Sequence, residues 1–273
     1  MIVLYQMETL KPLEWENIKK AATILLNSKN TIVLTGAGIS TESGIPDFRE
    51  DDGIWKKYPI ETFGGLESFL KDPSKFWKMA EEIAPTLFNA LPNPGHLALA
   101  ELEKMKLIKA IITQNIDELH QNAGNVIVYE VHGNINRFFC LGCRASYTKK
   151  QILNKLKKEK GSAPQCDYCT APLRPSVVLY GENLPNFEKY MSVDLAKKSE
   201  VMLIAGSSLT VAPVCDLPVY TLRGGGKLII VNDQPTSLDD KAEVVINNKT
   251  GTILPLIVEE IKRNQIKRKI ETK

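Results

Sequence analysis

Six short runs of β-branched and other apolar residues limit the fold of this 273-residue chain more strongly than any other feature. Each run has the length and continuity of a strand that is buried on both faces, and helix-like segments lie between them. This alternation predicts an α/β domain with a doubly wound parallel sheet. The predicted strands are 31–35, 108–113, 126–130, 201–205, 227–231 and 243–246, with helical stretches at 99–107 and 117–123.

The composition is that of an ordinary globular protein. Hydrophobic residues make up 43% of the chain and charged residues 25%, and the net charge of +3 is too small to indicate nucleic-acid binding by itself. No apolar stretch approaches the ~20 residues of a membrane-spanning helix. The first residues, MIVLYQ, have neither the basic flank nor the cleavage site of a signal peptide. We therefore expect a cytoplasmic protein.

Two segments interrupt the pattern of the sheet. The first is rich in aromatic residues, and the second contains four of the five cysteines. The second also contains KKQILNKLKKEK, a basic amphipathic helix whose lysines fit a solvated face better than a surface for an acidic partner. We expect one large domain formed by 1–44, 91–136 and 181–273, with a helical module at 45–90 and a metal-binding module at 137–180.

The four cysteines of the second segment form two C-x-x-C motifs, each with two thiolates on one tight turn. Four such sulfurs suit tetrahedral zinc, and they leave no open position for a catalytic water. The alternatives are two disulfides, which need an oxidising compartment, or a redox dithiol, which explains one motif but not two. We expect one structural Zn²⁺ held by a small zinc-ribbon module through Cys140, Cys143, Cys166 and Cys169.

Glycines follow the first predicted strand at Gly36 and Gly38. In a doubly wound fold this turn brings the backbone close to a pyrophosphate. The signal is weak by itself, because the third glycine of G-x-G-x-x-G is missing and a plain structural turn explains it equally well. Small or polar residues also end two later strands, at 206–208 and 232–233. Open α/β sheets bind ligands at the carboxyl ends of strands, so these residues favour a nucleotide site.

His132 follows a predicted strand and precedes Gly133, where its ring could reach a ligand. An imidazole with a pKa near ~6.5 suits proton transfer near neutrality, although a structural hydrogen bond is the alternative. Gln114, Asn115 and Asp117 end another strand, and such a polar run is costly to bury without partners. A ligand that carries a carboxamide would supply partners, but helix capping by Asn115 or Asp117 is the alternative that the residues alone favour slightly.

Together these segments resemble the sirtuins, a family of NAD-dependent protein deacylases. The similarity runs from about residue 15 to about residue 260, in the order expected for the family. The matching stretches are Gly36–Ser40, Gly44–Arg49, Thr113–Asp117, His132–Gly133, the two cysteine motifs, Arg174–Pro175, Val177–Val178, Gly181–Pro185, Gly206–Leu209 and Val231–Asn232.

The resemblance implies a Rossmann-like NAD-binding domain, a zinc module and a helical module that carries a mobile cofactor loop. It implies that NAD is consumed and is bound by Gly36, Ala37, Gly38, Thr41, Asp47, Phe48, Arg49, Gln114, Asn115, Ile116, Asp117, Gly206, Ser207, Ser208, Asn232, Asp233 and Thr250. The acyl-lysine peptide would add as a strand, bound by Val178, Leu179, Tyr180, Gly181, Leu209 and Val211.

The resemblance also implies the reaction. The oxygen of acetyl-lysine attacks the ribose carbon that bears nicotinamide, and His132 acts as general base on a ribose hydroxyl. Asn115 and Asp117 would position the ribose and the amide. The products would be nicotinamide, O-acetyl-ADP-ribose and free lysine. One alternative is a mono-ADP-ribosyltransferase that uses the same NAD site, and another is a zinc-ribbon scaffold that binds nucleic acid.

Sirtuins that prefer succinyl or malonyl groups resemble one another in a Tyr-x-x-Arg pair, whose arginine meets the acyl carboxylate. Alignment from Pro73 and Trp77 puts Ala80 and Ile83 at these positions, so we expect acetyl-lysine and longer uncharged acyl groups as substrates. The partners would be acetylated proteins or peptides, with a chromatin or nucleoid protein as one candidate. We expect neither membrane association nor direct nucleic-acid binding.

Overall fold

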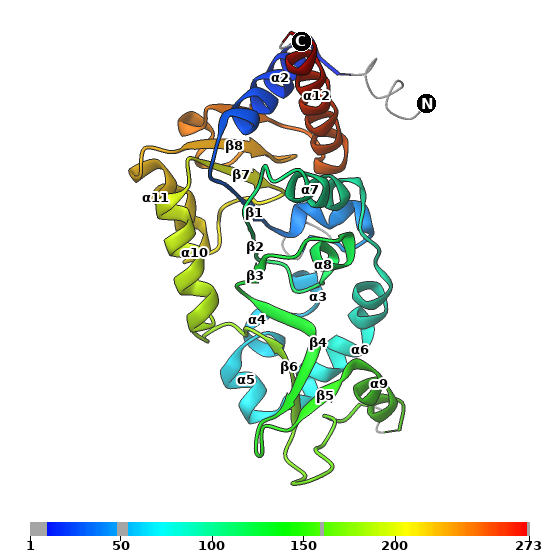
Figure 1. Ribbon diagram of the computed structural model, residues 1–273. Helices are drawn as coiled ribbons and strands as arrows, with labels where there is room; N and C mark the ends of the chain where they lie inside the picture. The colour runs from blue at the N-terminus through cyan, green and yellow to red at the C-terminus, as the bar shows by residue number, and fades with distance from the viewer. Residues whose placement is uncertain (1–9, 48–53, 159–160, 272–273) are drawn as a thin grey trace.

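A computed structural model describes residues 10–47, 54–158 and 161–271 (Figure 1). Its larger sheet has six parallel strands in the order β3-β2-β1-β7-β8-β9. The prediction of a doubly wound parallel sheet is confirmed, and three of its strands, β2, β3 and β9, are shorter than predicted. The strands are β1 (Thr31–Thr35), β2 (Ile111–Thr113), β3 (Val128–Glu130), β7 (Val201–Ala205), β8 (Lys227–Val231) and β9 (Val244–Ile246).

Helices cover both faces of this sheet, because neighbouring side chains of a strand point to opposite faces. In β1, Val33 joins the apolar core beneath α2, α7 and α12, whereas Ile32 and Leu34 join the core beneath α10 and α11. Figure 1 shows these two helical layers on either side of the strands. The helices are α2 (Pro12–Asn27), α7 (Pro94–Lys104), α10 (Asn186–Lys198), α11 (Leu217–Arg223) and α12 (Thr250–Glu271).

The described part of residues 45–90 contains four helices. Asp72 caps the longest of them, α6, by accepting a hydrogen bond from the Ser74 amide, and Pro73 occupies its first turn, where no amide donor is needed. Phe76 of α6 contacts Phe69 edge to face, so α5 packs on α6. The helices are α3 (Ile54–Lys57), α4 (Ile60–Phe63), α5 (Leu66–Lys71) and α6 (Pro73–Asn89).

The segment that carries the cysteines folds into an antiparallel sheet of order β5-β4-β6 with one helix, α9. Trp77 of α6 stacks on Phe138 of β4, and its indole N–H donates to the Leu173 carbonyl at 3.0 Å. The two modules therefore share one core and form a single small lobe. The elements are β4 (Gly133–Cys140), β5 (Ser146–Thr148), α9 (Lys149–Lys158) and β6 (Leu173–Val177).

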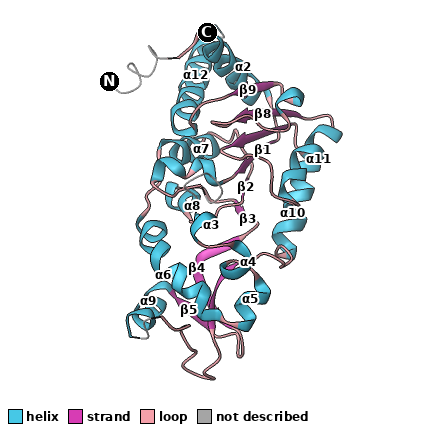
Figure 2. Ribbon diagram, turned by 180° about the vertical axis from the view of Figure 1, so that it is seen from behind, coloured by secondary structure: helices cyan, strands magenta, loops and turns pink. Residues whose placement is uncertain are grey.

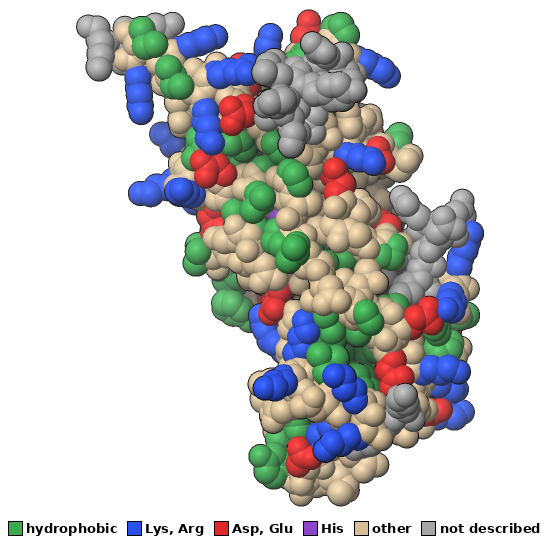
Figure 3. Space-filling view, turned by 90° about the vertical axis from the view of Figure 1, so that its right-hand side faces the viewer, with side chains coloured by type: hydrophobic (Ala, Val, Ile, Leu, Met, Phe, Trp, Pro, Cys, Tyr) green, Lys and Arg blue, Asp and Glu red, His purple; other side chains and the backbone are tan. Residues whose placement is uncertain are grey.

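The large domain, which contains the six-stranded sheet, and the small lobe lie at opposite ends of the molecule (Figure 2). In the described ranges, no helix has both the length and the apolar content that a bilayer crossing requires. On the face shown in Figure 3, Lys and Arg side chains lie among Asp and Glu side chains. The short elements are η1 (Ala37–Ile39), η2 (Thr41–Ser43), α8 (Leu119–Ala123), η3 (Val214–Asp216) and η4 (Asp239–Lys241).

Candidate active site

A cavity of about 370 Å³ is lined by the carboxyl ends of β1, β2, β3 and β7 and by α6, β4, β6 and α9 of the small lobe. Parallel strands end at one edge of the sheet, so segments that are distant in sequence meet there. The predicted site residues that line this cavity are Gly36, Ala37, Asp47, Gln114, Asn115, Ile116, Asp117, His132, Val178, Leu179, Tyr180, Gly181, Gly206, Ser207, Ser208 and Val211.

Other predicted site residues lie outside the cavity lining. Leu209 is 6% exposed and packs into the core beneath α10 and α11. Asn232 is buried and donates to the Gln234 carbonyl at 2.6 Å. The hydroxyl of Thr250 is buried and has no hydrogen-bond partner within the described part of the chain, which suits a polar ligand group. Gly38 and Thr41 also lie outside the lining, and so does Asp233, which is exposed. Phe48 and Arg49 lie outside the described residues.

The glycines after β1 are required by a backbone contact. A Cβ at Gly36 would lie 2.9 Å from the Gly206 carbonyl oxygen, and one at Gly38 would lie 2.9 Å from both the carbonyl oxygen and Cα of Gly206. Gly206 itself has φ of 64°, a region that favours glycine. The turns that follow β1 and β7 thus touch through their backbones, and both border the cavity. This close contact with Gly206 accounts for the structural turn that the sequence offered as one of two explanations of these glycines, and their contact with NAD stays a prediction.

A buried serine holds two of the predicted catalytic residues in place. The Ser40 hydroxyl donates to Asp117 Oδ2 at 2.7 Å and accepts from Asn115 Nδ2 at 3.0 Å. Asn115 Nδ2 also donates to the Gly36 carbonyl at 3.1 Å. Ser40 belongs to the matching stretch Gly36–Ser40, but the sequence did not predict it as a site residue because its partners are distant in sequence. The structure places it between the turns that follow β1 and β2.

The buried carboxylate of Asp117 has hydrogen-bond partners within the protein. Its Oδ1 accepts the amide of Leu119, the first residue of α8, at 3.0 Å, and the residue also lines the cavity. Burial raises the pKa of Asp117, and the hydrogen bonds from Leu119 and Ser40 oppose this rise. A carboxylate oxygen can accept two hydrogen bonds, so Asp117 can keep the Leu119 amide and still receive a ligand amide.

The orientation of His132 follows from its backbone neighbours. Its Nδ1 lies 3.0 Å from the Gln114 carbonyl oxygen. A carbonyl only accepts, so Nδ1 carries the proton and Nε2 is the proton acceptor of the neutral ring. Gly133 has φ of 79°, and a Cβ there would meet the Ser176 carbonyl at 1.9 Å. The His132 carbonyl also accepts the Val178 amide at 2.8 Å, which joins the histidine to the predicted peptide-binding segment.

The other two histidines form a buried pair behind the cavity wall. The rings of His96 and His120 are 5.0 Å apart. Burial lowers the pKa of His96 to about 4, and burial together with His96 lowers the pKa of His120 well below its ordinary value. His120 Nε2 lies 2.9 Å from the Thr35 hydroxyl, and His96 Nε2 lies 3.5 Å from the Ser40 hydroxyl. Both rings are therefore neutral at pH 7 and have structural contacts.

A bidentate ion pair fixes the segment that follows β6. The Arg174 guanidinium donates to both carboxylate oxygens of Glu182 at 2.7 and 2.8 Å, and to the Val177 carbonyl at 2.6 Å. Glu182 also accepts the Leu179 amide at 2.7 Å. Burial alone would raise the pKa of Glu182, but these hydrogen bonds outweigh burial and the pKa is lowered. Both residues stood in the sequence motif without a role, and the structure gives them one.

The cavity wall in the small lobe is apolar. Ala80 and Ile83, the positions aligned with the Tyr-x-x-Arg pair, both line it, together with Trp77 and Phe138. Lys189 is the only lysine or arginine among the described residues of the lining. Among the described residues, the wall at Ala80 and Ile83 therefore offers no cation to an acyl carboxylate.

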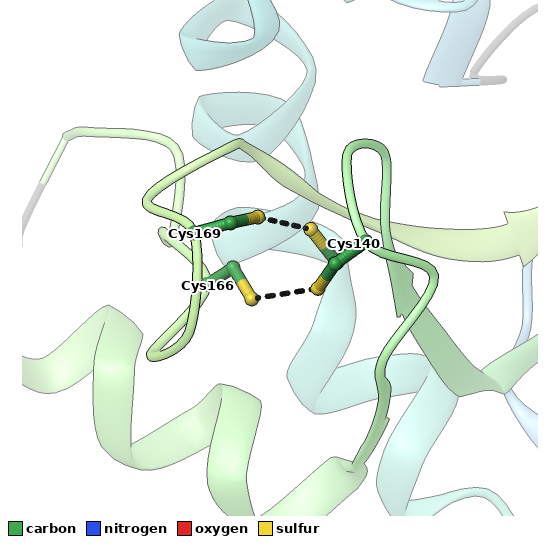
Figure 4. A group of neighbouring side chains, drawn as sticks. Cys140, Cys166 and Cys169 are labelled. Atoms are coloured by element: carbon green, nitrogen blue, oxygen red, sulfur yellow. Dashed lines mark hydrogen bonds between the residues drawn. The ribbon is translucent and has the colours of Figure 1, made fainter.

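The four paired cysteines converge at one point of the small lobe. All four sulfurs lie within 4.8 Å of one another. Cys140 faces Cys169 at 3.4 Å, and Cys143 faces Cys166 at 3.6 Å (Figure 4). A disulfide requires about 2.05 Å, whereas two sulfurs of a tetrahedral zinc site with bonds of about 2.3 Å lie about 3.8 Å apart. The residues therefore fit a zinc ion held by four thiolates, which would join the two cysteine turns.

Comparison with known proteins agrees with this geometry. The model of the Sir2 family matches residues 36–213. The NAD-dependent protein deacylase 2 of Archaeoglobus fulgidus is 45% identical over 249 residues, which cover 91% of this chain and 97% of that protein. The NAD-dependent protein deacetylase of Sulfurisphaera tokodaii is 46% identical over 249 residues, which cover 91% and 98% of the two chains.

A solved structure of similar fold contains a deacetylated peptide together with an acetylated ADP-ribose. It is a histidine-to-alanine variant of Sir2 with deacetylated p53 peptide and 3′-O-acetyl ADP ribose. It aligns with a TM-score of 0.85 at 42% identity, and the alignment covers 89% of this chain and 98% of the other.

The fold, the cavity and the four-cysteine site define an NAD-dependent deacetylase with a structural zinc module. The chain belongs to the Sir2 family. Its activity is the NAD-dependent removal of acetyl groups from protein lysines, which gives nicotinamide, O-acetyl-ADP-ribose and free lysine. The predictions of family, fold, activity, NAD and one zinc ion are confirmed.

Proposed function

We propose that the 370 Å³ cavity is the deacetylase active site and that His132 is its general base. The observation that supports this proposal best is that Ala37, His132 and Val178, from three separate segments, line one cavity. Ala37 belongs to the turn proposed to hold NAD, and Val178 belongs to the segment proposed to pair with the peptide.

The chemistry divides between the co-substrate and the protein. NAD supplies a ribose carbon at which the oxygen of acetyl-lysine displaces nicotinamide, so a C–O bond forms as the C–N bond breaks. His132 Nε2 takes a proton from a ribose hydroxyl, while the Gln114 carbonyl holds Nδ1–H and fixes the ring. The hydroxyl oxygen attacks the resulting imidate carbon, and water completes the release of lysine and O-acetyl-ADP-ribose. Asn115 and Asp117, held by Ser40, position the ribose and the amide. The remaining proposed contacts to NAD are those predicted from the sequence, including Phe48, Arg49, Asn232, Asp233 and Thr250.

Replacing the general base tests this proposal. His132→Asn should lower kcat for an acetyl-lysine peptide by at least about 100-fold, because general-base catalysis contributes about 10²–10⁴-fold. NAD affinity, measured by calorimetry, should change little. His120→Asn is the matched control, because His120 is buried against Thr35 and does not line the cavity. Normal turnover by His132→Asn would remove His132 from the mechanism.

The proposed substrates are acetylated proteins or peptides, bound mainly through backbone pairing along 178–181. A chromatin or nucleoid protein is the candidate substrate that we propose. We also propose that the enzyme itself is located in the cytoplasm. On the one face that Figure 3 shows, acidic and basic side chains are interspersed, which gives little support to nucleic-acid binding by that face. Mono-ADP-ribosyl transfer is distinguished by its product, because adenine label would then stay on the protein and not leave as acetyl-ADP-ribose.

A further inference from the structure

Tyr147 of β5 contacts the cysteine cluster although it is not one of its ligands. Its hydroxyl donates to Cys166 Sγ at 3.2 Å and accepts the Asp167 amide at 2.7 Å. Tyr147 is 5% exposed and Cys166 is 3% exposed, so this hydrogen bond is shielded from solvent.

The direction of the hydrogen bond follows from its two partners. The Asp167 amide can only donate, so the tyrosine oxygen accepts from it and the single hydroxyl proton points at sulfur. A zinc-bound cysteine is a thiolate, which makes it a charged acceptor and strengthens the bond. Within the described residues, Cys166 is the only one of the four cysteines whose sulfur accepts from a side-chain hydroxyl.

The surrounding residues hold the tyrosine and the second cysteine turn together. Lys155 of α9 forms an ion pair with Asp167, and its Nζ lies 5.8 Å from the centre of the Tyr147 ring. The backbone amide of Tyr168 also donates to Cys166 Sγ at 3.4 Å. The turn that bears Cys166 is thereby tied to both β5 and α9, and one lysine of the basic helix has a specific partner.

We propose that Tyr147 is a positioning residue of the zinc centre, whose hydroxyl holds the Cys166 sulfur in the orientation that the metal requires. Residues that orient metal ligands in this way change metal affinity by about 10- to 100-fold when they are replaced. The role concerns metal retention, so it is independent of the residues assigned to acetyl-lysine chemistry.

The test replaces the hydroxyl alone. Tyr147→Phe keeps the buried ring and should weaken zinc binding about 10- to 100-fold, measured by competition with a chromophoric chelator on the full-length protein. Tyr168→Phe is the matched control, because it changes a tyrosine on the same cysteine turn that is 80% exposed. The control should bind zinc as the unaltered protein does.

A second measurement separates metal positioning from packing. The melting temperature of Tyr147→Phe should fall below that of the unaltered protein when zinc is bound, and this difference should shrink after zinc is removed by chelation. Zinc affinity equal to that of the unaltered protein would overturn the proposal. An equal loss of melting temperature with and without zinc would also overturn it, because the hydroxyl would then serve only the fold.

Discussion

At the scale of single residues, we expect Ala80 and Ile83 to limit which acyl groups the cavity accepts. Ala80 is 6% exposed and faces the cavity with Ile83, so the wall at these two positions has neither a phenol nor a guanidinium. An ionised acyl group at this wall would lose its hydration without gaining a partner, and an unpaired buried charge is costly. The sequence alignment suggested this preference, and the position of both side chains in the cavity lining supports it.

We therefore predict that succinyl-lysine peptide is turned over at least about 100-fold more slowly than acetyl-lysine peptide, because an uncompensated buried charge costs about 3–5 kcal/mol. The measurement is kcat/KM for two peptides that differ only in the acyl group. The double variant Ala80→Tyr with Ile83→Arg should raise succinyl turnover relative to acetyl turnover, because arginine can pair with the carboxylate. Comparable turnover of both peptides by the unaltered protein would contradict this assignment.

At the scale of elements, the segment after β6 is held from both sides. The Arg174–Glu182 ion pair fixes its backbone, and Tyr180 bridges to Gly65 of the helical module. The Val178 amide bonds to the His132 carbonyl, so the same segment adjoins the proposed general base. A peptide that pairs with this segment would therefore meet a backbone that is already ordered, which lowers the entropy lost on binding.

Glu182→Gln tests this ordering. The variant leaves the buried guanidinium of Arg174, whose side chain is 6% exposed, without its charged partner. We expect a loss of about 3–5 kcal/mol in the free energy of unfolding and a raised KM for peptide. Asp194→Asn is the control, because its ion pair with Lys198 is largely exposed and should contribute at most about 1 kcal/mol. A KM for peptide unchanged by Glu182→Gln would show that the ion pair does not order the binding segment.

At the scale of the whole molecule, the cavity is lined by residues of both the large domain and the small lobe. The large domain packs its sheet between two helical layers, while the small lobe has one core that α6 shares with β4 and α9. The buried pair of His96 and His120 lies where the turns after β1 and β2 join α7. Because both rings must be neutral in the folded state, they link the stability of the protein to pH.

The sign of this linkage follows from the lowered pKa of His96. An unfolded histidine binds a proton below about pH 6.5, but folded His96 binds one only near pH 4. Stability is therefore complete above pH 6.5 and is lost as pH falls toward 4, with roughly 3 kcal/mol due to His96. The free energy of unfolding, measured with urea between pH 7 and pH 4, should show this loss. His96→Gln should make the free energy of unfolding depend less steeply on pH. An equal slope in both proteins would exclude His96 as its source.

The sequence alone predicted the six strands, apart from the ends of three of them, and the four cysteines that converge on one point. These features are local: an apolar run fits a strand buried on both faces, and a C-x-x-C turn puts two sulfurs side by side. Gln114, Asn115, Asp117 and His132 were singled out because they lie within a few residues of a strand end. Their roles in NAD binding and catalysis were predicted from the resemblance to the sirtuins.

Only the tertiary structure decided which side chains hold those residues in place. Ser40 lies 77 positions from Asp117, and Tyr147 lies 19 positions from Cys166, so no local pattern reveals either contact. The burial of Leu209, the backbone contact between Gly36 and Gly206 and the neutral histidine pair also arise from packing between distant segments. Periodicity records the face that a residue presents, whereas the hydrogen-bond partner on that face depends on how the chain is folded.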